Sequence, residues 1–276
     1  MTGSQQASLH GRRAFVTPED YLVGRGGVAA GGNDKPLIVL PGSPDTVALF
    51  DDFLGDLVAS EWVIGGDTGQ NAQSVVGTSV SGNTNGVYNM TSSASVTQTP
   101  VVGSQSINTP PHWKANQGRL RFGVRLRTAV LAGNTVFAGF TDTGGNEIGA
   151  YDTGGGILTP ADNYVGFIWS GEGGATQQAY RCVAGKAGVD QVATPVGSVI
   201  TPTANVYDVL EVELPGNDGA TANFYINGKP YAQIASAAVT PTTPLAAGVW
   251  RANTDGAADS IGIDWINASA ARDTGT

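Results

Sequence analysis

The chain has 276 residues, of which 40 are glycine and one is cysteine, and its formal net charge is −9. A chain of this length can bury a stable core without a disulfide or a metal ion. Its one cysteine, Cys182, cannot form an internal disulfide, so the disulfide-rich secreted class is excluded. An acidic chain repels phosphate backbones, and no apolar run approaches the ~20 residues of a membrane helix, so we expect neither a nucleic acid nor a membrane partner.

Residues 1–45 are rich in glycine and proline and show no sustained hydrophobic period. Such a stretch cannot bury enough apolar surface to fold alone, so we predict an extended N-terminal arm. The arm is either a flexible terminus or an anchor that docks on a partner. As an anchor it would use its basic pair and its short apolar pieces, namely Arg12, Arg13, Tyr21, Leu22, Leu37 and Ile38. The opening residues have no basic segment followed by an apolar stretch, so we expect no signal peptide.

Residues 46–276 are predicted to form one domain. Residues 46–60 carry the only weak helical spacing, and this segment is also short enough to be a turn that leads into the first strand. Beyond it, apolar and polar residues alternate with period two, which predicts half-buried strands. The predicted strands are 119–127, 135–141, 164–170, 179–183, 207–214, 248–252 and 261–267. The polar tract 69–106 gives no secure register.

Turn residues complete the fold prediction. Asn227-Gly228 lies between two apolar runs, which is the strongest local signal for a hairpin. Many short strands joined by Gly, Asn, Asp and Thr turns predict an all-β protein. We therefore expect a two-sheet antiparallel jelly-roll sandwich behind the N-terminal arm.

The order of these signals resembles that of concanavalin A-like jelly rolls of the laminin-G and laminarinase type. The resemblance lies in Phe50-Asp51-Asp52-Phe53 with Glu61-Trp62, in 118–126 and 136–142, and in the finish at 224–228 and 261–266. It implies that the last strand returns beside the first. This fold hosts lectins, glycanases and structural modules alike, so the resemblance implies a fold rather than an activity.

The composition and layout of the chain also resemble those of bacteriophage virion proteins. Head-decoration proteins and head fibres join a Gly/Pro-rich N-terminal arm to a jelly roll rich in Ala, Gly, Thr and Asn and poor in Lys and Cys. In such proteins the arm grips the shell and the sandwich projects from it. The resemblance implies a partner in the major capsid protein or another virion protein.

The predicted strands carry few candidates for catalytic carboxylates. Retaining glycosidases need two carboxylates about 5–5.5 Å apart, and laminarinase-type jelly rolls carry three acids at alternate positions of one strand. The nearest match is Glu211-Val212-Glu213, which lacks the third acid and ends at Pro215. This favours a solvent-facing pair of acids over a catalytic pair, so we expect no hydrolase and no other enzyme.

Other reactive groups are sparse. His10 and His112 lie in no nucleophile motif, and Cys182 sits in an alternating run that favours a small buried hydrophobe. The oxygen-rich turn 142–147 fails the EF-hand spacing and is expected to be an ordinary turn. We predict no metal and no cofactor.

Two surface features are candidates for binding a partner. Arg119, Arg121, Arg125 and Arg127 share one strand face, where four like charges repel unless acids or a partner neutralise them. Neutralisation within the chain by Glu211 and Glu213, on an adjacent strand, is one alternative, and a contact with another subunit or a shell is the other.

A tryptophan ring could stack on a glycan if it were exposed. Trp113 follows Pro110-Pro111 and is expected to be exposed, whereas alternation places Trp169 and Trp265 in the core.

Together these observations predict a non-enzymatic structural protein of a virion, assembled in the host cytoplasm. The most specific expectation is a homo-oligomeric capsid decoration or head-surface protein that is anchored by its arm. The alternative is a glycan-binding adhesin module of a phage fibre or tail. A third alternative, a divergent glycanase, rests on Glu211 and Glu213 alone.

Overall fold

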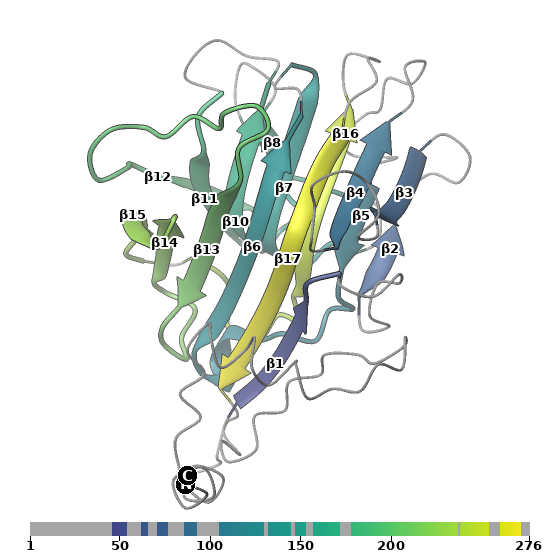
Figure 1. Ribbon diagram of the computed structural model, residues 1–276. Coiled ribbons are helices and arrows are strands. Elements are labelled where there is room, and N and C mark those ends of the chain that lie inside the picture. The colour runs from purple at the N-terminus through teal and green to yellow at the C-terminus, as the bar shows by residue number, and fades with distance from the viewer. Residues whose placement is uncertain are drawn as a thin grey trace, which may run out of the picture.

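The computed structural model describes residues 46–53, 62–65, 71–76, 86–92, 105–129, 132–144, 147–152, 157–171, 178–236, 238–253 and 260–271. These residues form two antiparallel β-sheets packed face to face (Figure 1). The predicted all-β, two-sheet antiparallel sandwich is thereby confirmed. No helix of the described part is long and apolar enough to cross a membrane.

The sheet nearer the viewer in Figure 1, here called the front sheet, has eight strands. In spatial order its path is β15 (Lys229–Ile234), β14 (Ala222–Ile226), β13 (Asp208–Leu214), β6 (Leu120–Thr128), β17 (Ser260–Ala271), β4 (Val87–Ser92) and β3 (Asn71–Val76). The eighth strand, β1 (Thr46–Asp51), pairs with the final half of β17, from Thr46 opposite Ala271 to Asp51 opposite Ile266. The last strand therefore lies beside the first, as the family resemblance implied.

The other sheet, here called the back sheet, has seven strands. In spatial order they are β12 (Val189–Ala193), β11 (Arg181–Lys186), β10 (Tyr164–Ser170), β7 (Asn134–Thr141), β16 (Ala246–Asn253), β5 (Gln105–Asn108) and β2 (Val63–Gly65). A two-stranded unit of β8 (Tyr151–Asp152) and β9 (Ile157–Leu158) and a short 3-10 helix, η1 (Ala115–Gln117), complete the described elements.

All seven predicted strands are present, with ends that shift by at most four residues. The helical alternative for residues 46–60 is wrong where the structure describes it, because Thr46–Asp51 is β1. Pairing with β17 overrides the helical spacing there. In the tract 69–106, β3, β4 and the start of β5 are strands, and apart from residue 86 the remainder lies outside the described residues.

The core lies between the inward faces of the two sheets. Phe167 of the back sheet meets Phe224 of the front sheet edge to face, with ring centroids 5.4 Å apart, and Phe122 meets Phe140 in the same manner at 5.9 Å. Cys182 is 1% exposed within this core, and burial raises the pKa of its thiol well above the ordinary value. The prediction of a buried cysteine is confirmed.

The hairpin between β14 and β15 turns at Asn227 and Gly228, whose φ angles are 52° and 73°. Two successive residues with positive φ are typical of a type I′ turn, which matches the twist of the flanking strands. A side chain added at Gly228 meets nothing within 4 Å. We therefore expect Gly228→Ala to cost only the backbone strain, about 1–2 kcal/mol of unfolding free energy, as measured by urea denaturation. A loss several times larger would show that the turn makes contacts beyond its own backbone.

Candidate functional site

The predicted arginine row lies on the outer face of the front sheet. Arg121, Arg125 and Arg127 point outward from β6, on the side opposite the buried Phe122, Val124 and Leu126. Arg119 immediately precedes this strand. β13 and β17 flank β6, so the residues that could neutralise the row come from these two neighbours.

Two of the four arginines form ion pairs within the chain. Arg119 pairs with Glu213 of β13, and this hydrogen bond is the main reason that the pKa of Arg119 is raised. Arg125 pairs with Asp264 of β17. The expected internal neutralisation is therefore confirmed for Glu213, while the second acid comes from β17 and not from Glu211.

Aromatic rings lie among these charges. The guanidinium carbons of Arg125 and Arg127 lie 4.4 Å and 5.1 Å from the centroid of the Tyr207 ring. The Tyr225 hydroxyl donates to Glu213 at 3.4 Å. Both rings are partly exposed. We call the set formed by Arg119, Arg121, Arg125, Arg127, Glu211, Glu213, Asp264, Tyr207, Tyr225 and Trp265 the arginine face.

The acid pair of β13 differs from its sequence interpretation. Glu211 and Glu213 do point to the same side, but only Glu211 is partly exposed, whereas Glu213 is 4% exposed. The interpretation of both as solvent-facing is therefore wrong for Glu213. Burial is tolerated there because Arg119 supplies the compensating charge and Tyr225 a hydrogen bond.

The tryptophans also depart from expectation. Trp113 is 5% exposed, because its backbone forms a β-bridge with Leu245 that turns the ring into the core, where its Nε1 donates to Thr109 Oγ1 at 3.0 Å. The expectation of an exposed Trp113 that could stack on a glycan is thus wrong. Trp169 is 4% exposed in the core, as predicted.

Trp265 was assigned to the core by alternation but lies on the outer face of the front sheet. The pairing of β17 with β6 shifts between Ile263 and Trp265, so Asp264 is the extra residue of a β-bulge. A bulge moves every later side chain to the other face. Trp265 is consequently partly exposed and stacks on Phe50 of β1, with ring centroids 6.4 Å apart.

The outer face of the back sheet is covered by the chain itself. Phe137, Tyr164, Ile168 and Trp250 point outward from its central strands and are almost fully buried. They pack in a second hydrophobic cluster against residues between β7 and β10, namely Ile148, Ala150, Tyr151, Ile157 and Ala161. This covering occupies the surface that an open sheet would offer to a ligand.

Tyr164 and Tyr180 predict a loss of stability in alkali. Burial raises the pKa of both phenols above the ordinary value of 10, and the nearby carboxylates Asp190 and Asp208, respectively, raise it further through their charge and a hydrogen bond. Below pH 10 both states of the chain hold these protons, whereas above it only the unfolded chain releases them. The unfolding free energy should then fall by about 1.4 kcal/mol per pH unit for each tyrosine.

Urea denaturation from pH 9 to 11 measures this fall. Tyr164→Phe should lose about 1 kcal/mol at neutral pH with its hydrogen bond, yet decline less steeply above pH 10. Equal slopes for the variant and the wild type would contradict the assignment.

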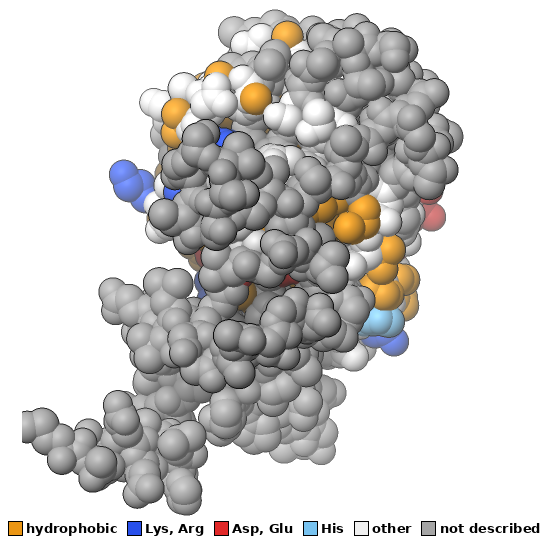
Figure 2. All heavy atoms as spheres, turned by 45° about the vertical axis from the view of Figure 1, so that its right-hand side comes forward, with side chains coloured by type: hydrophobic (Ala, Val, Ile, Leu, Met, Phe, Trp, Pro, Cys, Tyr) orange, Lys and Arg blue, Asp and Glu red, His pale blue; other side chains and the backbone are white. Residues whose placement is uncertain are grey.

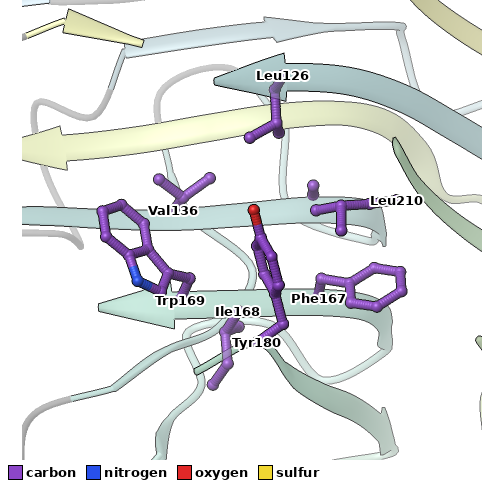
Figure 3. Close-up of a pocket in the computed structure, with 8 residues that line it drawn as sticks. Leu126, Val136, Phe167, Ile168, Trp169, Tyr180 and Leu210 are labelled. Atoms are coloured by element: carbon purple, nitrogen blue, oxygen red, sulfur yellow. The ribbon is translucent and has the colours of Figure 1, made fainter. Parts of the chain in front are cut away.

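A small apolar cavity lies between the sheets, lined by Leu126, Val136, Ala138, Phe167, Ile168, Trp169, Tyr180 and Leu210 (Figure 3). Its volume of about 10 Å³ is at the lower limit for one water molecule. The Tyr180 hydroxyl, which Figure 3 shows pointing between the aliphatic side chains, donates to Asp208 at 3.0 Å. The cavity belongs to the core and is too small for an organic ligand.

The remaining candidates bring no reactive groups together. Asp142, the first residue of the oxygen-rich segment 142–147, accepts hydrogen bonds from the backbone and side-chain nitrogens of Asn163, 21 positions further along the chain. His112 is exposed. In the described ranges no three residues among His, Cys, Asp and Glu are grouped so as to hold a metal ion. The predicted arm, residues 1–45 with Arg12, Arg13, Tyr21, Leu22, Leu37 and Ile38, lies outside the described residues.

Comparison with known proteins identifies the fold. The chain matches no family model and no curated protein. Among solved structures it is similar to a protein of unknown function from Shewanella oneidensis MR-1 (16% identity, 95% of this chain and 97% of the other, TM-score 0.50). It is also similar to the Emp47p carbohydrate recognition domain (12% identity, 82% and 95%, TM-score 0.54).

A third similar structure comes from work on endo-acting O-glycanases of the human gut microbiota (12% identity, 82% and 99%, TM-score 0.51). Identities this low establish fold and not activity. The chain has the concanavalin A-like lectin/glucanase jelly-roll fold.

Proposed function

We propose that this protein is a non-enzymatic structural component of a virion, a capsid-surface protein whose sandwich is the projecting body and whose residues 1–45 are the anchor. The observation that carries the proposal is where the sandwich begins. β1 (Thr46–Asp51) pairs along its whole length with the last strand, so the described sandwich includes the chain from Thr46 onward. The Gly/Pro-rich composition of the segment that precedes β1 supports a role in binding a partner rather than in forming a core of its own.

The state of the acid pair on β13 supports a non-catalytic role. A retaining glycosidase uses one carboxylate as nucleophile and one as a proton donor. Glu213 is instead held by Arg119 and Tyr225 on the outer surface of a sheet. The outer face of the back sheet, which could otherwise hold a substrate, is covered by the chain's own apolar residues.

Deletion of residues 1–45 tests the anchor. Because the deletion ends immediately before β1, the truncated sandwich should unfold at nearly the same temperature as the full chain while losing its association with particles. Particles purified from cells that carry the gene, analysed by quantitative mass spectrometry, give the copy number relative to the major shell protein. Undiminished association of the truncated chain would refute the anchor, and absence of the chain from particles would refute the virion role.

A second candidate, a glycan-binding module, is favoured by one observation. Trp265 and Phe50 form a stacked and partly exposed aromatic pair, and partly exposed rings of this kind can stack on sugars. Binding on a glycan array that disappears in Trp265→Ala, but persists in Trp113→Phe, would support this role. Silence of the wild type on the array would exclude it for the glycans tested.

A further inference from the structure

The arginine face holds charges that its own ion pairs do not use. With Arg119 and Arg125 paired, Arg121, Arg127 and Glu211 remain, and in the part of the chain that the structure describes none of them has an opposite charge within the 4.0 Å of an ion pair. Glu211 lies opposite Gly123 in the pairing of β13 with β6, two residues from Arg121 along the sheet. The face therefore presents unused charges of both signs side by side.

The composition of the face is that of a protein interface. β13, β6 and β17 contain no lysine, and their outward side chains include three arginines and Trp265, with Tyr207 and Tyr225 alongside. Arginine, tyrosine and tryptophan are enriched where proteins bind one another, and lysine is depleted. The stacked and partly exposed Trp265 adds apolar area that a partner would bury.

We propose that two copies of this chain bind through their arginine faces, front sheet against front sheet, about a twofold axis. A twofold axis makes each surface its own partner, so the surface must be self-complementary. Unused charges of both signs satisfy this condition, since Glu211 of one copy meets Arg121 of the other, and the reverse contact follows by symmetry. Each contact turns two charges that have no ion-pair partner within the described chain into an intermolecular ion pair.

Other occupants fit the face less well. A purely acidic protein or polysaccharide would engage Arg121 and Arg127 but would be repelled by Glu211 between the arginines. A second copy supplies both signs in the same spacing. Figure 2 brings forward the right-hand side of Figure 1, where edge strand β2 lies, and hydrophobic side chains are visible on it. Val63 and Ile64 of β2 are exposed, and nothing in the described part of the chain indicates what would cover them.

Charge exchange between the two positions tests the proposal with the full chain. Arg121→Glu and Glu211→Arg each place like charges across the twofold axis, so each variant alone should be at least tenfold weaker as a dimer in sedimentation equilibrium. Mixed together, the two variants should form a heterodimer of near wild-type affinity, because each acid then faces an arginine. Lys186→Glu, the same change of charge at the far end of β11, should leave the dimer intact.

The mixing step separates this contact from a loss of folding, since a misfolded variant would not recover a partner. A wild type that remains monomeric at the highest concentration overturns the proposal, and so does a mixture that stays monomeric. Dimerisation unaffected by either single variant would also overturn it. The outcome can be told apart from that of the anchor test, because the exchanged charges lie in β6 and β13 and the anchor test removes only residues 1–45.

Discussion

Gly139→Ala should lower the free energy of unfolding by about 3 kcal/mol or more. A Cβ at this position of β7 would lie 2.2 Å from the carbonyl oxygen of Val165 and 2.6 Å from the Cα of Gly166. Both obstacles are backbone atoms of the paired strand β10, so no side chain can rotate away. The clash can be relieved only if the central strands of the back sheet move apart, and this movement weakens the hydrogen bonds between them.

Gly139 is the central member of a row of three glycines that crosses the back sheet. It pairs directly with Gly166 of β10 and with Gly248 of β16, and a Cβ at either neighbour would also meet backbone, at 2.4 Å from a carbonyl oxygen. Gly144→Ala is the matched control, because a Cβ there meets nothing within 4 Å, and its effect should stay within about 0.5 kcal/mol. Urea denaturation of the two variants measures the difference, and equal stabilities would show that the strands can part at little cost.

Asn134→Ala should cost about 3 kcal/mol, since it removes an acceptor from a buried charge. Arg251 is 0% exposed, and its Nε donates to Asn134 Oδ1 at 2.6 Å while a terminal nitrogen donates to Gln105 Oε1 at 2.8 Å. The Gln105 amide in turn donates to the carbonyl oxygen of Thr91 on the front sheet. The network thus joins the two sheets through a guanidinium that has no access to water.

Two further variants identify the cause of this loss. Asn134→Asp keeps an acceptor of the same shape and adds a charge opposite Arg251, so it should retain most of the stability that Asn134→Ala loses. Asn223→Ala removes an amide acceptor from a surface bond to Gln233, and should change stability by less than about 0.5 kcal/mol. If thermal and urea unfolding rank Asn134→Asp as low as Asn134→Ala, the loss comes from packing and not from the buried charge.

Local patterns predicted the strands well, because burial on one face imposes a period of two on strands such as β6 and β13, and strands buried on both faces, such as β10, are short apolar runs. Tyr164–Ser170 was predicted residue for residue, and the Asn227-Gly228 turn was predicted because few other pairs accept positive φ at both positions. The burial of Cys182 followed from the same alternation.

The candidate site was predictable only in part. The arginine row was visible in the sequence, and so was its neutralisation by Glu213, once β13 was taken to lie beside β6. Asp264 gave no such signal, because no residue type in the sequence marks a β-bulge in advance. Tyr207 gave none either, because it lies just before β13. Trp113 was misjudged because its burial depends on a bridge to Leu245, which lies 132 positions further along the chain.

Local sequence patterns are enough to establish the all-β class, the position of most strands and the hairpin turn, since each follows from neighbours a few residues apart. The folded chain alone shows which strands are adjacent, that the side chains of β17 change faces at the bulge, and that the outer face of the back sheet is covered. Those outcomes depend on contacts between residues distant in the chain, whose free energies of packing and pairing exceed any local preference. The charges left unused on the arginine face became visible only after those contacts had been assigned.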